Sequence, residues 1–173
     1  NVFRPADINE TLECWEIALK SKNTPSAIAL SRQKLPYINP SFTKKNKCEL
    51  GAYIVNITSQ NYVINLIASG SEVEIALDAQ KKLKEINIDS KVVSMPCQEL
   101  FDKQSSSFKN EIIDKNIPVI TIEASCVYSW KKYSSHNMSI ETFGESAPYK
   151  EVYSHFKLTG TNVVEFVKKI IKE

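Results

Sequence analysis

The sequence lacks the features that mark several common classes of protein. Its four cysteines form no C-x-x-C pair and show no zinc-ligand spacing with either of the two histidines, which favours reduced thiols in a cytosolic protein. No signal peptide is present, and no apolar run approaches the roughly 20 residues that a membrane-spanning helix needs. We therefore expect a cytoplasmic protein that is neither secreted nor inserted in a membrane.

The charged residues are also not concentrated in any one stretch of the sequence. The net charge is only +2 and the lysines are scattered, so the sequence does not indicate a nucleic-acid binder. The densest cluster is Lys44-Lys45-Asn46-Lys47, and no aromatic residue within it could stack on bases. A solvated linker explains this cluster better than a binding patch.

The stretch from 63 to 83 is the organising element of what is there. Residues 63–68 are continuously apolar apart from Asn65, as expected for a strand that is covered on both faces. Ser69-Gly70-Ser71 then forms a turn, with Ser71 as the predicted N-cap of a helix. Apolar residues follow at helical spacing, namely Val73, Ala76, Leu77 and Leu83. This segment predicts a strand, a turn and an amphipathic helix.

The same turn could in principle hold a phosphate, because a helix N-terminus attracts anions. One glycine between two serines is neither the dinucleotide fingerprint nor a P-loop, and Glu72 and Glu74 would repel a phosphate. An ordinary turn and helix cap is the favoured interpretation, with an anion site as the alternative.

Strand-like and helix-like segments alternate through the rest of this part of the chain. Further strands are predicted at 53–58, 91–95, 118–122 and 139–142, and further helices at 108–113, 126–133 and 148–156. Thr161 is the predicted cap of a last helix, in which Val164, Val167 and Ile171 share a face. The pattern predicts an α/β fold, a three-layer, mainly parallel sheet with helices on both faces.

The first 50 residues are typical of the end of a different domain. Asp7 and Glu10 have the spacing of a capping box, and Leu12, Trp15 and Leu19 line one face of the helix that follows. Residues 27–30 form a wholly apolar strand of the kind buried in a parallel sheet. One helix and one strand cannot bury a sheet, so we expect this strand to need neighbours that the sequence does not supply. Residues 34–50 have linker composition, and the domains are placed at 1–45 and 46–173.

Few residues carry recognisable chemistry in the larger domain. Ser69, Ser94 and Glu123 follow predicted strands, where α/β enzymes often place functional groups, but strand ends are polar in any case. His136 and His155 have no nucleophilic partner at a telling spacing, which favours surface or packing roles. In the 143–148 loop we expect Gly144 to permit a turn and Glu145 to accept bonds from nearby backbone amides.

Arg32 is the best candidate for a functional residue. It lies in Ser31-Arg32-Gln33, which ends the apolar strand, and a guanidinium there can grip a phosphate with two parallel hydrogen bonds. The alternative from chemistry alone is a surface arginine in a salt bridge.

Motifs from one end of the chain to the other carry a family resemblance. They are Arg4-Pro5-Ala6-Asp7 with Glu10, residues 29–33, 35–36, 51–53, 67–73, 92–96, 101–104 and 123–124, Trp130, Lys132-Tyr133 and residues 142–148. In this order they closely resemble transketolase. The chain departs from the family pattern at Ser125, where the family usually has glycine, and between residues 133 and 143.

The resemblance implies a fold and a division of labour. Residues 1–45 would be the end of the pyrimidine-binding domain, and residues 46–173 the C-terminal domain. Arg32 occupies the position that binds the phosphate of the sugar substrate. No catalytic, cofactor or metal residue is expected here, because thiamine diphosphate and its divalent metal, Mg or Ca, are held by parts that precede this segment in the family.

The resemblance also implies an activity for the intact enzyme. A homodimer of the pentose phosphate pathway would transfer a two-carbon ketol unit from a ketose phosphate to an aldose phosphate. The present segment alone would be inactive. The competing hypothesis is a stand-alone, non-catalytic module for dimerisation or for binding a small regulatory ligand.

Overall fold

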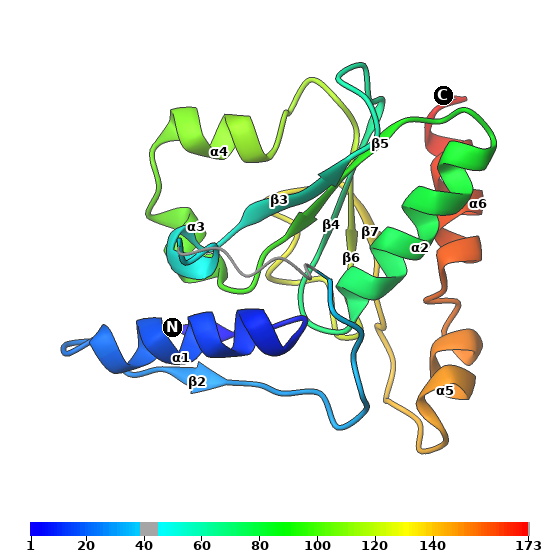
Figure 1. The fold of residues 1–173 in the computed structure, drawn as a ribbon. Helices are drawn as coiled ribbons and strands as arrows, with labels where there is room; N and C mark the ends of the chain where they lie inside the picture. The colour runs from blue at the N-terminus through cyan, green and yellow to red at the C-terminus, as the bar shows by residue number, and fades with distance from the viewer. Residues whose placement is uncertain (39–44, 173) are drawn as a thin grey trace.

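A five-stranded sheet forms the centre of the molecule (Figure 1). The computed structural model describes residues 1–38 and 45–172, and residues 39–44 of the predicted linker lie outside this part. The strands lie in the order β3 (Tyr53–Ile57), β5 (Ser90–Ser94), β4 (Ile64–Ala68), β6 (Val119–Ile122) and β7 (His136–Met138). Only β3 is antiparallel to its neighbour, so the predicted mainly parallel sheet is confirmed.

Strand β4 lies at the centre of this sheet and is buried along its whole length. It pairs with β5 and with β6, both parallel to it, so its polar backbone groups are bonded on two sides. The buried Asn65 side chain donates to the carbonyls of Asp114 and Ile117. The burial of β4 agrees with the continuous apolar run in the sequence, and β4 is the central strand of the fold.

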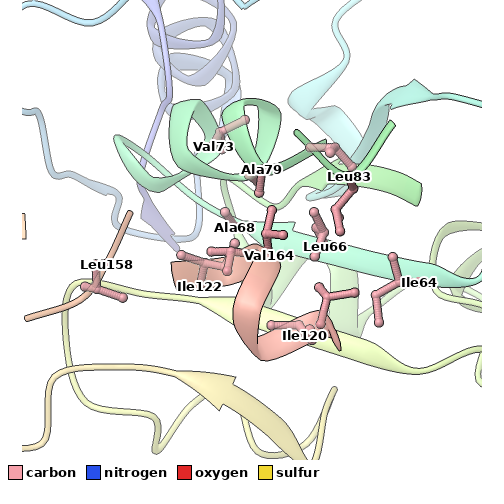
Figure 2. Close-up of a cluster of buried hydrophobic side chains, with 14 of the residues drawn as sticks. Ile64, Leu66, Ala68, Val73, Ala79, Leu83, Ile120, Ile122, Leu158 and Val164 are labelled. Atoms are coloured by element: carbon pink, nitrogen blue, oxygen red, sulfur yellow. The ribbon is translucent and has the colours of Figure 1, made fainter. Parts of the chain in front are cut away.

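Helices cover both faces of the sheet, which completes the predicted three layers (Figure 1). On one face, α2 (Glu72–Glu85) and α6 (Gly160–Ile170) pack against each other and against the strands. Figure 2 shows their apolar side chains meeting those of β4 and β6, among them Val73, Leu83, Val164, Leu66 and Ile120. The other face is covered by α3 (Gln98–Asp102) and α4 (Ser106–Ile112), with a second core around Phe101 and Trp130.

The N-terminal segment lies against the end of the sheet (Figure 1). It consists of β1 (Val2–Phe3), α1 (Ile8–Lys20) and β2 (Ala27–Ile28). The Arg4 amide donates to the Pro96 carbonyl (2.8 Å), and the Gly70 amide donates to the Arg4 carbonyl (2.9 Å). Gly70 has a positive φ of 56°, so its turn favours glycine. The segment therefore crosses the loops that leave the carboxyl ends of β4 and β5.

Strand β2 differs from the sequence prediction in one respect and agrees with it in another. It pairs, in parallel, with β1, a neighbour that the sequence itself supplies and that the pattern did not indicate. Ala27, Ala29 and Leu30 are exposed in this chain, which agrees with the expectation that this apolar strand needs further neighbours that the sequence does not supply. The predicted apolar face of α1 is exposed as well, at Ile8, Leu12, Trp15 and Leu19.

Three other local predictions are wrong. Residues 126–133 form successive turns instead of a helix, and the last strand is β7, which ends before the predicted 139–142. The last helix is capped by Thr159, whose hydroxyl accepts the Asn162 amide, and Thr161 lies inside it. Helix α5 (Tyr149–His155) begins directly after Pro148, as predicted.

The cap of α2 is also different from the prediction. Ser71 occupies the N-cap position but makes no capping hydrogen bond, and its hydroxyl donates to the Glu72 carboxylate (2.7 Å). The predicted N-cap role of Asp7 in α1 is confirmed, since Asp7 accepts the Glu10 amide at 2.8 Å, and the Glu10 carboxylate reaches back to accept the Ala6 amide, one residue before the cap. A short helix, η1 (Cys48–Leu50), lies where the linker was predicted, and it ends at Gly51. A Cβ at Gly51 would lie 2.2 Å from the Phe101 amide nitrogen, so only glycine fits there.

No helix in the ranges 1–38 and 45–172 combines the length and the apolar character that crossing a membrane requires.

Candidate functional site

Arg32 lies in an open pocket that joins two segments far apart in the sequence. Arg32 and Gln33 follow β2, and the other lining residues run from Ser146 to Tyr149, where α5 begins. The pocket has a volume of about 550 Å³. The structure therefore brings together two motifs that the sequence analysis treated separately, the 31–33 stretch and the 142–148 loop.

The Arg32 guanidinium is available to a ligand. Arg32 is exposed, and within residues 1–38 and 45–172 it forms no ion pair, so the predicted alternative of a surface salt bridge is not found there. Every other residue that lines the pocket is uncharged. Side-chain hydroxyls come from Ser146 and Tyr149. A cation surrounded by hydrogen-bond donors can hold a phosphate or another anion.

The 143–148 loop beside this pocket lacks, among the described residues, the interactions that were predicted for Gly144 and Glu145. A Cβ at Gly144 would meet no atom within 4 Å, so the turn there does not require glycine. Phe143 is almost fully exposed, and Glu145 is exposed beside it. The expected hydrogen bonds from backbone amides to Glu145 do not occur in the part of the chain that the structure describes.

A second cluster of charged residues lies at the carboxyl ends of the strands. The Arg4 guanidinium donates to Glu72 Oε2 at 2.8 Å and also to Glu123 Oε1. The Trp130 indole donates to Glu123 Oε2 (2.8 Å), and the Tyr153 hydroxyl donates to Glu72 Oε1 (2.7 Å). Both carboxylates are buried. This cluster joins the N-terminal segment to α2 and to the end of β6.

The electrostatics of the cluster follow from burial and pairing. Burial lowers the pKa of Arg4, but the carboxylates of Glu123 and Glu72 outweigh burial and raise this pKa above its ordinary value. For Glu123, burial is the largest effect and raises its pKa, although Arg4 acts in the opposite direction. The sequence does not indicate a role for Arg4 in this cluster, since its partners lie 68 and 119 positions away along the chain.

The three polar residues at strand ends have different environments. Glu123 belongs to the cluster around Arg4. Ser94 donates to Glu10 Oε1 at 2.6 Å and so connects β5 with α1. Ser69 is 1% exposed, and its hydroxyl has no hydrogen-bond partner among the described residues.

The histidines and cysteines do not form a reactive centre. His136 lies in the edge strand β7, and the ring of His155 packs edge-to-face against Phe156 (4.8 Å between centroids). All four cysteines are free; Cys14, Cys48 and Cys97 are buried together beside Phe3, and Cys126 is exposed. Among residues 1–38 and 45–172, no group of three or more His, Cys, Asp or Glu side chains could hold a metal ion.

Comparison with known proteins identifies the family. Residues 51–159 match the model of the transketolase-like C-terminal domain. A transketolase from Sinorhizobium medicae is 42% identical over 99% of this chain, and one from Bacillus subtilis is 38% identical over 100% of it. These alignments cover 25% and 27% of the two relatives.

The fold agrees with the sequence match. The solved structure of a transketolase from Leishmania mexicana superposes with a TM-score of 0.90 at 37% identity, covering 99% of this chain and 25% of the other. The chain thus spans about a quarter of the length of the curated relatives that it matches. With the family model covering more than half of its residues, the chain belongs to the transketolase family.

Proposed function

We propose that residues 1–45 of this chain are the end of the pyrimidine-binding domain of a transketolase and that residues 46–173 belong to its C-terminal domain. The match of residues 51–159 to the C-terminal domain supports the second assignment. The exposed apolar faces of α1 and β2 support the first, because a larger domain would cover them. The intact protein would work as a homodimer in the cytoplasm.

The intact enzyme would transfer a two-carbon ketol unit from a ketose phosphate to an aldose phosphate. Thiamine diphosphate, with a divalent metal, would supply the stabilisation of the carbanion. The described residues offer no cluster of metal ligands, so we assign the cofactor and the metal to parts of the enzyme outside this segment. This chain alone, without those parts, is then expected to show no two-carbon transfer when thiamine diphosphate and Mg²⁺ are added. Measurable turnover by the purified 173-residue chain would contradict the assignment of the cofactor and the metal to other parts of the enzyme.

Within that reaction, Arg32 would bind the phosphate of the sugar. The observation that carries this role is an exposed guanidinium that forms no ion pair with the residues the structure describes, in a pocket whose other lining residues are uncharged. Two parallel hydrogen bonds to a phosphate would hold the far end of the substrate and so position its reacting carbons. The hydroxyl of Ser146 lies in the same pocket and can add a further bond.

Substitution of Arg32 in the full-length enzyme tests this role. Arg32→Ala should lower kcat/KM for phosphorylated sugars roughly 10- to 100-fold, as expected for loss of a hydrogen-bonded charged group, and change it little for unphosphorylated sugars. Arg32→Lys should recover part of the loss, since it keeps the charge without the planar fork. Lys34→Ala is the matched control, because Lys34 is an exposed cation that does not line the pocket. Equal losses with both types of sugar would contradict the assignment.

A further inference from the structure

A pocket of about 290 Å³ lies between the N-terminal segment and the carboxyl edge of the sheet. Its lining includes Ser69, which follows β4, and Glu123, which follows β6. The connection after β4 leads to β5, which lies on one side of β4. The connection after β5 leads to β6, which lies on the other side of β4. Ligands of open α/β sheets bind at such a reversal of strand order. The position therefore fits a ligand site that is separate from the Arg32 pocket.

One side chain in this pocket lacks a partner. Ser69 lines the pocket, and its almost fully buried hydroxyl makes no hydrogen bond with any described residue. Buried polar groups are nearly always bonded, and an unpaired one destabilises the structure. A ligand in the pocket would provide the missing partner.

The charge of the pocket selects the kind of ligand. The lining has one cation, Arg4, and its guanidinium already bonds Glu123 in the pocket and Glu72 behind it. Glu99 adds another carboxylate at the exposed rim. Because carboxylates outnumber cations, the site repels phosphates and other anions and attracts a positive charge.

The remaining polar groups are those that bind alcohols. Besides Ser69, the lining includes Ser125, Ser129 and Gln98, and the Gln98 amide donates to the Ser129 hydroxyl at 3.3 Å. Its volume is near the small end of the roughly 300 to 1,000 Å³ that ligand pockets span. We propose that this pocket binds a small hydroxylated amine, with the ammonium group toward Glu99 and Glu123 and a hydroxyl bonded to Ser69.

Three sugars of similar size and different charge test the proposal at pH 7 on the 173-residue chain carrying Arg32→Ala, which removes the separate phosphate site proposed above. Glucosamine carries the ammonium group, glucose is neutral, and glucose 6-phosphate is an anion. We expect saturable binding of glucosamine by calorimetry, at least tenfold tighter than that of glucose, and no binding of glucose 6-phosphate. The absence of saturable glucosamine binding, or tighter binding of glucose 6-phosphate, would overturn the proposal.

The unpaired hydroxyl provides a matched pair of variants. Ser90 also has a buried hydroxyl without a described partner, but it lies at the opposite end of β5 from the pocket. Ser69→Ala should weaken glucosamine binding at least tenfold, and Ser90→Ala should change it less than twofold. Urea unfolding of both variants shows whether they are folded alike. Equal effects of the two substitutions on binding would overturn the role of Ser69.

Glu99 tests the ammonium contact at an exposed position, where Glu99 Oε2 accepts from the Val2 amide and from the Cys97 thiol, both at 3.3 Å. Glu99→Gln should weaken glucosamine binding several-fold and leave glucose binding unchanged. If Glu99→Gln weakened glucosamine binding and glucose binding to the same extent, selection of the ligand by its charge would be contradicted. None of these measurements depends on the activity of the intact enzyme, so they stand apart from the test of Arg32.

Discussion

The Tyr53 hydroxyl lies 2.8 Å from Glu10 Oε1 and joins the first turn of α1 to the first strand of the sheet. The same oxygen accepts from Ser94, and Glu10 Oε2 accepts the Ala6 amide at 2.6 Å. The carboxyl group is buried, and this burial raises its pKa to about 7, against the opposing effect of these three hydrogen bonds. The joint between the N-terminal segment and the sheet thus contains a carboxyl group that titrates near neutral pH.

This raised pKa makes stability depend on pH. Folded Glu10 holds its proton more tightly than the unfolded chain, so its contribution is fully present below pH 4.5 and is lost as pH rises through about 7. The shift corresponds to roughly 3 kcal/mol. We expect Glu10→Gln to flatten the fall in unfolding free energy between pH 5 and 7.5, as measured by urea denaturation at each pH.

Glu74→Gln is the control for Glu10, because it makes the same chemical change at an exposed position on α2. It should keep the slope of the parent chain. A Glu10→Gln variant with an unchanged slope would show that another group causes the pH dependence.

Arg4 should contribute more to stability than the other arginine of the chain, Arg32. Arg4→Met leaves the buried carboxylates of Glu72 and Glu123 without their cation, which should cost about 3 kcal/mol. Arg32→Met makes the same change at an exposed residue and should stay within about 0.5 kcal/mol. Urea denaturation at pH 7 measures both. Similar values for the two variants would mean that the cluster around Arg4 adds little to stability.

The sequence was sufficient to predict the strands that are buried along their whole length and the helix that is buried along one face. Strands β4, β5 and β6 and helix α2 have apolar runs or periodic apolar faces, because the core covers them on one or both sides. Strand β7 has the sequence His-Asn-Met, in which only Met138 is apolar, and it pairs with β6, so the sequence contains no apolar pattern that would indicate a strand.

Tertiary contacts explain the false helix at 126–133. Trp130 and Tyr133 have helical spacing, but the Trp130 indole is bonded to Glu123, and Tyr133 donates to Asp102 at 2.7 Å. The backbone follows these contacts in successive turns. The cluster around Arg4 could not be predicted for a related reason, since it forms only when three distant parts of the chain meet at the edge of the sheet.

The two tryptophans provide a direct test of the proposed domain assignment. Trp15 is 51% exposed on the apolar face of α1, and Trp130 is 2% exposed in the core. In the 173-residue chain, acrylamide should therefore quench Trp15 strongly and Trp130 weakly, which Trp15→Phe and Trp130→Phe variants separate. If α1 belongs to a larger pyrimidine-binding domain, Trp15 should become protected in the full-length protein, while Trp130 stays unchanged. Trp15 that is quenched equally in both proteins would contradict the assignment, because its face of α1 would then remain in solvent.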